Sequence, residues 1–434
     1  MTTIPSKQID DLRLAANGGC AESQATLAVK YASGVDVGRD YQKAEELFRR
    51  SAEAGYAAAQ RDLGRMYQYG LGLAQDYGLA ASWYEKAASQ GLALAQFDLA
   101  LLHDQGLNPL VDEDTAVRLY RAAAQQGMER DVYNVGVGHF EGHDFPQDRE
   151  KAFERFRVAA EQRLPSALYQ IGFMYEHGLG VRQCFAEAAA RYLEAADAGS
   201  TDAAFAIGTL FEHGLGMAKD FQRALAWYEV AAAAGVASAQ FNLARLHSFG
   251  WGTPIDAPLA ARWFEQAATQ GHCQAQCFLA QAYENGEGVD QSYPTALSWF
   301  EKAAERGSED APLSLGSLHL FGRGVEQDVP AAIKWYGLAA ERGNSWASYC
   351  LAQIHMQEGG TGDEIEALKW LTIGASSTHL LDADRAQRLL DAYTDLSESL
   401  DPTSRAASER LAQEWIAANW KEAPSIMTPL LQIN

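Results

Sequence analysis

Two small groups of residues have types and spacings that could bind a metal. His139, Glu141 and His143 alternate along the chain, and imidazole and carboxylate groups are common ligands of zinc and other transition metals. Cys273 and Cys277 lie four positions apart, so they would face the same side of a helix. A closed tetrahedral site needs more ligands than one helical face offers. What these residues do therefore depends on the elements that carry them.

Those elements recur every 36 residues. Gly199 and Gly235 are one period apart, and the step continues without insertion or deletion from Gly55 to Gly343, with Arg163 as the single non-glycine. A second series of glycines follows the first predicted helix of each unit: Gly34, Gly70, Gly106, Gly142, Gly178, Gly214, Gly250, Gly286 and Gly322. A fixed period of this length is typical of a solenoid built from one supersecondary unit per repeat.

Residues 201–236 show what one unit contains. Apolar residues at helical spacing around Ile207 predict a first helix, which Gly214 ends in the left-handed conformation. A second helix starts at the N-cap Asp220, and Trp227 and Tyr228 belong to its apolar stripe. Neither helix can bury its apolar face alone, so successive units must stack.

The positions of these residues in the repeat argue against a metal site. Gly142 occupies the helix-ending position, so His143 leaves the helical face, while His139 stands where other repeats carry an aromatic residue. No two of the five cysteines share a position in the repeat, which excludes a disulfide repeated from unit to unit. No phosphate-binding loop, nucleophile elbow or paired-cysteine zinc signature occurs. We therefore expect no catalytic residue, no metal and no cofactor.

The repeated positions resemble the Sel1-like repeat, a relative of the tetratricopeptide repeat. One good instance consists of Ala59, Leu63, Gly64, Tyr67, Gly70, Gly72, Asp76, Ala80, Trp83, Tyr84, Ala87, Ala88 and Gly91. The resemblance covers about three quarters of the chain, since nine units fill residues 21–344. It implies an all-α, right-handed superhelical solenoid of helix pairs. It also implies adaptor or scaffold roles in protein–protein assembly, without chemistry of its own.

The predicted organisation has four parts. Residues 1–20 are a partial N-terminal repeat, 21–344 are nine repeats, 345–377 are a degenerate tenth, and 378–434 are a helical C-terminal cap with an extended tail over 421–434. In the cap, an apolar face at Trp415, Ile416 and Trp420 is expected to pack on the last repeat. The middle of the array is irregular, because Arg155 and Arg191 stand where most second helices carry tryptophan.

The chain is strongly acidic. Its 35 lysines and arginines against 57 aspartates and glutamates give a net charge of −22, which repels nucleic acid and anionic membrane surfaces. No stretch is long and apolar enough to cross a bilayer, so we expect no membrane insertion. The N-terminal residues lack the features of a signal peptide, which favours a cytoplasmic protein. A periplasmic or lumenal location is the alternative if a signal peptide was removed.

A partner-binding surface is expected on the first helices, which line the concave face in tetratricopeptide-like solenoids. Two sets of positions are candidates: one lies two residues before the core leucine, and the other is the pair that precedes the capping glycine. The residues concerned are Tyr133, Phe140, Tyr169, Glu176, His177, Phe205, Glu212, His213, Phe241, Phe249 and Glu284. The aromatic residues fit core packing between repeats equally well, and the glutamates fit a solvated face.

The sequence thus favours a non-enzymatic adaptor that binds a protein or peptide along its concave face. Aromatic residues among carboxylates would suit a segment that carries Lys or Arg. A self-assembling scaffold, a homo-oligomer paired through its N-terminal edge or C-terminal tail, is the first alternative. A hydrolase or metal-dependent enzyme comes third.

Overall fold

The computed structural model describes residues 6–108, 112–358, 360–378 and 381–420. These residues form helices joined by turns, and no strand occurs among them. Contacts divide the chain into two compact units, residues 1–220 and 221–434. The expected tail at 421–434 lies outside the described residues. No helix in the described part of the chain is both long enough and apolar enough to cross a bilayer.

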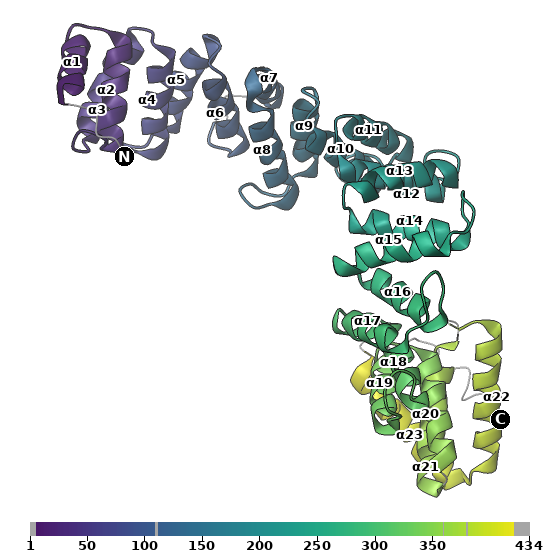
Figure 1. Ribbon diagram of the computed structural model, residues 1–434. Coiled ribbons are helices and arrows are strands. Elements are labelled where there is room, and N and C mark those ends of the chain that lie inside the picture. Colours follow the sequence, from purple (N-terminus) through teal and green to yellow (C-terminus); the bar gives the residue numbers. More distant parts are fainter. Residues whose placement is uncertain (1–5, 109–111, 359, 379–380, 421–434) are drawn as a thin grey trace. The chain divides into compact units, whose positions relative to one another are not determined.

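The first unit is a run of antiparallel helix pairs in which each pair packs on the next (Figure 1). Its helices are α1 (Ser6–Asn17), α2 (Ala21–Ser33), α3 (Tyr41–Glu53), α4 (Ala57–Tyr69), α5 (Tyr77–Ser89), α6 (Ala93–Asp104), α7 (Glu113–Ala123), the π-helix η1 (Ala124–Met128), α8 (Glu129–Glu141), α9 (Arg149–Ala160), α10 (Pro165–His177), α11 (Phe185–Asp197) and α12 (Thr201–His213). The first helix of a repeat carries an even number from α2 to α12, and the second helix carries the next odd number.

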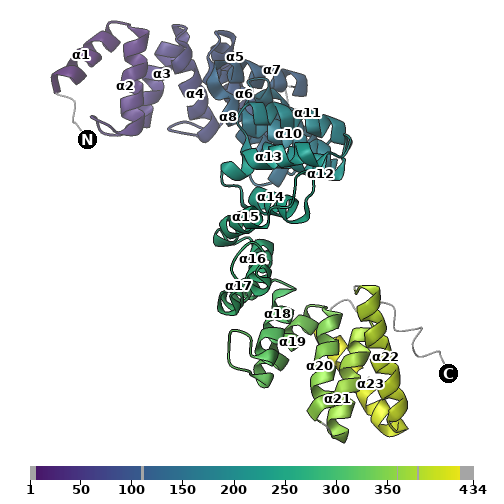
Figure 2. The ribbon, with the colours of Figure 1, turned by 45° about the vertical axis from the view of Figure 1, so that its right-hand side comes forward.

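The second unit continues the same alternation and ends in a helical bundle. Its helices are α13 (Phe221–Ala233), α14 (Ala237–Phe249), α15 (Ala257–Thr269), α16 (Cys273–Asn285), α17 (Tyr293–Glu305), α18 (Ala311–Phe321), α19 (Val329–Glu341), α20 (Ser345–Glu358), α21 (Thr361–Ala375), α22 (Ala383–Ser399) and α23 (Pro402–Asn419). Figure 2 shows α20 to α23 lying side by side at the end of this unit.

The ends of the helices follow the predicted chemistry. Gly214 has φ +72° after α12, in the left-handed region that a residue with a β-carbon adopts only at a cost. The side chain of Asp76 accepts a hydrogen bond from the Leu79 amide and so caps α5. At Arg163, where other repeats carry glycine, a side-chain-bearing residue takes φ +57°. The backbone conformation of the repeat is thus kept even where its usual residue is missing.

In the repeats that begin with α4, α8, α10 and α18, an aromatic ring of the second helix packs against a glycine of the first. A β-carbon on Gly172 would lie 2.6 Å from the ring of Tyr192, and one on Gly64 would lie 2.7 Å from the ring of Tyr84. The glycine therefore makes room for the ring, and both tyrosines are buried. Trp227, which the sequence places in the same apolar stripe, is only half-buried.

The C-terminal helices close the array as expected. Ile416 of α23 is buried, and the ring of Trp415 meets Trp370 of α21 edge-on at 5.2 Å. Trp420 follows α23, and its indole Nε1 donates a hydrogen bond to the carbonyl oxygen of Ala340 at 3.4 Å. These contacts cover the apolar surface that the last repeat would otherwise expose.

Candidate functional site

The pair of residues before each capping glycine splits into an inward and an outward position. In three repeats of the first unit, the inward residue accepts a hydrogen bond from a buried tyrosine of the second helix. The hydroxyl of Tyr84 donates to Gln68 at 2.6 Å, and that of Tyr192 donates to Glu176 at 2.6 Å. The predicted acidic position is therefore occupied, at Glu176, by a contact that holds the two helices of its own repeat together.

The three candidate glutamates are not a freely solvated stripe. Glu176 and Glu284 are half-buried, and Glu212 is buried. Burial raises the pKa of Glu284, which the positive charge of Arg323 only partly offsets. Burial, together with the hydrogen bond to Glu176, also raises the pKa of the Tyr192 hydroxyl, which remains a neutral donor at neutral pH.

The outward position faces solvent. His177 and His213 are exposed, and the Nδ1 atom of each donates to the carbonyl oxygen four residues earlier, at 3.0 Å and 2.9 Å. Phe249 at the same position in α14 is 48% exposed, and its ring lies 5.0 Å from Trp251. The equivalent Phe321 of α18 is 61% exposed. A ligand on the first helices would therefore meet histidine and aromatic side chains at this position.

The candidate aromatic ladder lies against the core. Tyr133 packs on Phe156 with ring centroids 5.2 Å apart, and Tyr169 packs on Tyr192 at 5.5 Å. Both candidates are half-buried, as is Phe205. The rings of Tyr133 and Tyr169 therefore contact the buried aromatic residue of the second helix of their own repeat.

The remaining candidates differ in burial. Phe140 is half-buried between Phe156 and Phe173, at 6.4 Å and 6.5 Å. Phe241 is only 6% exposed and packs on Phe264 at 5.9 Å. In the first unit the structure thus brings Tyr169 and Glu176 together on one tyrosine, whereas in the second unit it separates buried Phe241 from exposed Phe249. A partner-binding role for all eleven candidates stays a prediction.

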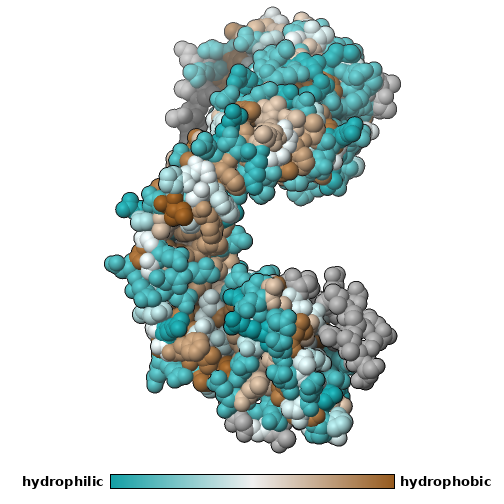
Figure 3. Space-filling view, turned by 90° about the vertical axis from the view of Figure 1, so that its right-hand side faces the viewer, coloured by the Kyte–Doolittle hydropathy of each residue, from teal (hydrophilic) through white to brown (hydrophobic). Residues whose placement is uncertain are grey.

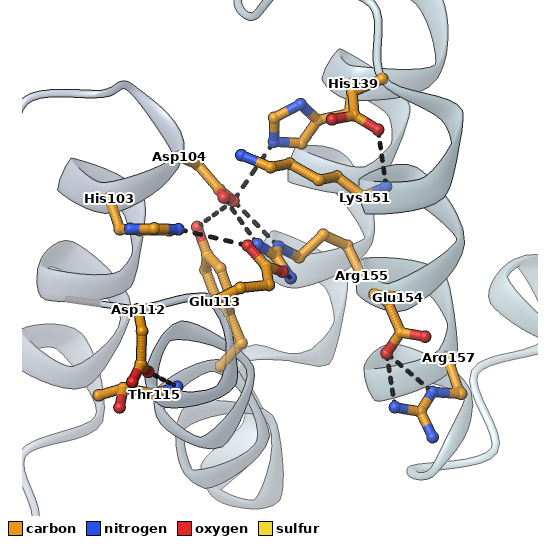
Figure 4. Close-up of polar contacts among 12 residues, drawn as sticks. His103, Asp104, Asp112, Glu113, Thr115, His139, Lys151, Glu154, Arg155 and Arg157 are labelled. Atoms are coloured by element: carbon orange, nitrogen blue, oxygen red, sulfur yellow. Dashed lines mark hydrogen bonds and ion pairs between the residues drawn. The ribbon is translucent and has the colours of Figure 1, made fainter. Parts of the chain in front are cut away.

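A buried polar cluster between α6 and α9 was not expected (Figure 4). Arg155 is fully buried, and its guanidinium donates to both carboxylate oxygens of Asp104 at 2.7 and 3.0 Å. A third bond joins it to Glu113 at 2.6 Å. The Tyr120 hydroxyl donates to Asp104 at 2.9 Å, and Nε2 of His139 lies 3.4 Å from the same carboxylate.

The charges in this cluster stabilise one another. Burial by itself would raise the pKa of Asp104, but the hydrogen bonds and the positive charge of Arg155, with His139 nearby, outweigh it and hold that pKa well below its usual range. The pKa of Glu113 is lowered in the same way, because its bond to Arg155 outweighs its partial burial. The carboxylates and the guanidinium therefore stay ionised together inside the first unit.

The residues that could bind a metal do not form a metal site in the structure. His139 is buried at this cluster, whereas His143 is exposed and lies 2.9 Å from Glu141, so the alternating residues do not converge. His103, Asp104 and Glu113 place ligand atoms within 4.8 Å of one another. The Arg155 guanidinium, however, already binds both carboxylates, and a cation there would meet its positive charge.

Sequence reasoning missed two features of the surface and the core. Nothing local marks Arg155 as buried, because its partner Asp104 lies 51 residues away. Exposed apolar residues outside the candidate set include Ile255 at 69% and Tyr69 at 57%. Tyr69 precedes a capping glycine as Phe249 does, so the repeat register could have identified Tyr69 as a candidate. The face in Figure 3 is mainly hydrophilic with separate apolar areas.

Helix pairs at a fixed period, with side chains exposed on the first helices, define a helical repeat scaffold. Such scaffolds typically mediate protein–protein interaction and are typically non-enzymatic. The chain belongs to the Sel1 repeat family. The Sel1 repeat model matches residues 21–56, 57–92, 93–128, 132–163, 165–200, 201–236, 237–272, 273–308, 313–344 and 349–379. The predicted family and the all-α solenoid of 36-residue repeats are thereby confirmed.

Two solved structures illustrate the similarity. A protective antigen present in uropathogenic Escherichia coli strains, which displays an SLR fold, is 28% identical with a TM-score of 0.50; the match covers 98% of this chain and 97% of that one. A Sel1 repeat protein from Oxalobacter formigenes is 32% identical with a TM-score of 0.47, over 72% of this chain and 90% of that one. No curated protein gives a significant match.

Proposed function

We infer that the chain is a non-enzymatic adaptor that binds a protein or peptide along the concave face lined by its first helices. The observation that carries this proposal is the exposure of large side chains at the end of those helices. Phe249 and Phe321 are 48% and 61% exposed, whereas the other large apolar side chains of their helices are buried or half-buried. Exposed large apolar side chains are a feature of interaction sites.

The charge of the chain favours a partner that carries Lys or Arg. A net charge of −22 attracts a basic segment at long range. The half-buried Glu176 and Glu284 would add to this attraction at the surface itself. Electrostatic attraction of this kind weakens as salt screens the charges.

Capture of partners from the native host, followed by mass spectrometry, identifies the molecule to test. Its affinity for the chain is then compared with that for Phe249→Ser and for Glu176→Gln, which removes the charge but keeps an acceptor for Tyr192. Both variants are expected to bind about tenfold more weakly, and the effect of Glu176→Gln is expected to shrink at high salt. Glu187→Gln on the second helix α11 is the matched control. Unchanged affinity in both variants would refute the concave-face site.

A self-assembling scaffold is the second candidate, and the N-terminal edge favours it. Leu14 of α1 is 75% exposed, and Val29 of α2 is 47% exposed. Exposed apolar side chains on two adjacent helices suit contact with another copy. Light scattering separates the candidates, because an adaptor has the mass of one chain and a scaffold has a multiple of it. Leu14→Glu should reduce a multiple to the single mass.

A further inference from the structure

The first unit contains a cleft that the concave-face proposal does not use. It lies between the second helices α9 and α11, beside α10, and has a volume of about 350 Å³. Its floor is apolar and includes Phe153, Leu168, Ile171 and Tyr175. Pockets that take small ligands begin at about this size. None of the candidate binding residues lines it.

The other repeats show what normally fills this place. In α5, Trp83 packs against the buried cluster that joins the preceding repeat to Leu63 of its own first helix, beside Tyr67. Trp299 of α17 packs in the same way against the cluster that contains Leu279, beside Tyr283. Three periods after Trp83, Leu63 and Tyr67 stand Arg191, Ile171 and Tyr175. The cleft is therefore the space that an indole ring fills elsewhere in this chain.

Arg191 does not fill this space with its own side chain. Its guanidinium turns to Glu194, with Nη1 2.7 Å from both carboxylate oxygens. The other charges at the rim are paired as well. Glu161 accepts two bonds from Arg121 at 2.6 and 2.8 Å, and Arg157 donates to Glu154 at 3.0 Å. Since each rim charge has an opposite partner, the cleft favours a neutral occupant over an ionic one.

We propose that this cleft binds the side chain of a tryptophan that a partner protein presents. The apolar floor would take the ring, as it does around Trp83 and Trp299. A carboxylate oxygen of Glu161 or Glu194 at the rim is an acceptor for the indole N–H, which can only donate. Lys86 and Lys302 lie over the rings of Trp83 and Trp299 at 3.8 and 4.0 Å. The guanidinium of Arg191 at the rim is placed to make the same kind of contact.

A small probe tests the site directly in the full chain. N-acetyl-L-tryptophanamide is titrated while the methyl signals of Leu168 and Ile171 are followed by NMR. Saturable shifts with a Kd of about 1 mM are expected, because a ligand of this size binds weakly on its own. N-acetylglycinamide, which lacks the ring, should cause no shift. Absence of saturable shifts with the tryptophan probe overturns the proposal.

A variant that fills the cleft provides the second test. Arg191→Trp restores the residue of the regular repeats, so it should weaken probe binding at least tenfold and raise the thermal midpoint. Arg182→Trp, at an exposed position of the same repeat, adds an indole outside the cleft and should leave binding unchanged. If Arg191→Trp binds the probe as tightly as the natural chain, the cleft is not the site.

A third variant keeps the proposal testable if Arg191→Trp does not fold. Leu168→Gln restores the glutamine that Gln60 and Gln240 provide elsewhere, where its side-chain amide donates to the preceding second helix. It makes the floor polar and should weaken the probe at least fivefold. Unchanged affinity would place the probe elsewhere. If light scattering shows that Arg191→Trp abolishes a dimer of the natural chain, the occupant is a second copy and the partner assignment is wrong.

Discussion

The regular repeats of the second unit and the irregular repeats of the first treat one position of the second helix in opposite ways. In the second unit, Trp299 and Trp335 each place a half-buried indole on a core cluster that joins the preceding repeat to their own. In the first unit, Arg155 at this position is fully buried in a polar cluster, and Arg191 turns outward beside an open cleft. One position thus serves as apolar packing, as buried charge or as a vacant site.

The difference shows what a repeat position does and does not specify. Caps and glycines set the backbone of each repeat, so the second helix forms whether this position carries tryptophan or arginine. The use of the side chain depends on the residues that surround it, from its own repeat and from the preceding one. Arg155 is buried because Asp104 and Glu113 supply carboxylates, whereas Arg191 finds the apolar residues Ile171 and Tyr175 and remains at the rim.

Removing the carboxylate that pairs with Arg155 should have the largest effect. Asp104→Ala leaves the guanidinium buried with one partner, Glu113, and should lower the free energy of unfolding by about 3–5 kcal/mol. Urea unfolding followed by circular dichroism measures this. Asp197→Ala removes an exposed carboxylate of the same unit and should change stability by less than about 0.5 kcal/mol. Equal effects in the two variants would show that Arg155 does not depend on its pairing.

The same cluster can be converted to the apolar chemistry of the regular repeats. Asp104→Leu combined with Arg155→Met removes both charges and should destabilise much less than Asp104→Ala, because no ion is left buried and only the Tyr120 hydroxyl loses its acceptor. Measured beside Asp104→Ala, this double variant separates the value of the pair from the cost of leaving one partner alone. A double variant as unstable as Asp104→Ala would mean that the polar cluster itself stabilises the unit.

Removing the indole should give the next-largest loss of stability, and only in the regular repeats. Trp299→Ala should lower the free energy of unfolding by about 2–3 kcal/mol, less than for a fully buried tryptophan, because the ring is half-buried. Arg191→Ala at the same position of α11 should stay within about 0.5 kcal/mol. Thermal unfolding of both variants tests the difference. Similar losses would contradict the vacant state of the cleft beside Arg191.

Acid should affect the first unit through Asp104. Its pKa in the folded chain lies below the ordinary value of 3.8, so the stabilisation is complete above that pH and is lost as the pH falls toward the folded value. The loss for this group is limited to about 1.4 kcal/mol per pH unit. The free energy of unfolding, measured with denaturant between pH 5 and about 2.5, should fall more steeply with decreasing pH for the natural chain than for Asp104→Asn. The same slope in both chains would contradict a lowered pKa.

The smallest expected effect is a gain. Arg163 holds φ +57° where other repeats have glycine, a conformation that is strained for a residue with a β-carbon. Arg163→Gly should raise the free energy of unfolding by about 1 kcal/mol, since the relief of strain exceeds the entropy that glycine adds to the unfolded chain. The control is Gly199→Arg, the reverse change one repeat later, which should destabilise by a similar amount. A stability decrease for Arg163→Gly would show that its side chain makes a compensating contact.

The candidate site was predictable only in part. The register placed Glu176 and His177 beside each other before Gly178, but it did not distinguish the residue that bonds Tyr192 from the one that faces solvent. At a helix end, either residue could point toward the second helix or toward solvent. Only the position of the neighbouring tyrosine decides which of the two points inward. Phe241 and Phe249, taken from different positions of the repeat, were both candidates, yet Phe249 is exposed and Phe241 is buried.

The sequence by itself determined the repeat, its period, the helices and their caps. These features depend on residues that are near one another in the chain, such as Asp76 with the Leu79 amide or Gly214 at the end of α12. Only the tertiary structure decided where Arg155 and Arg191 point, which glutamates are engaged and where a cleft remains. Those outcomes depend on contacts between neighbouring repeats, and the repeat pattern does not encode the residue that each neighbour supplies.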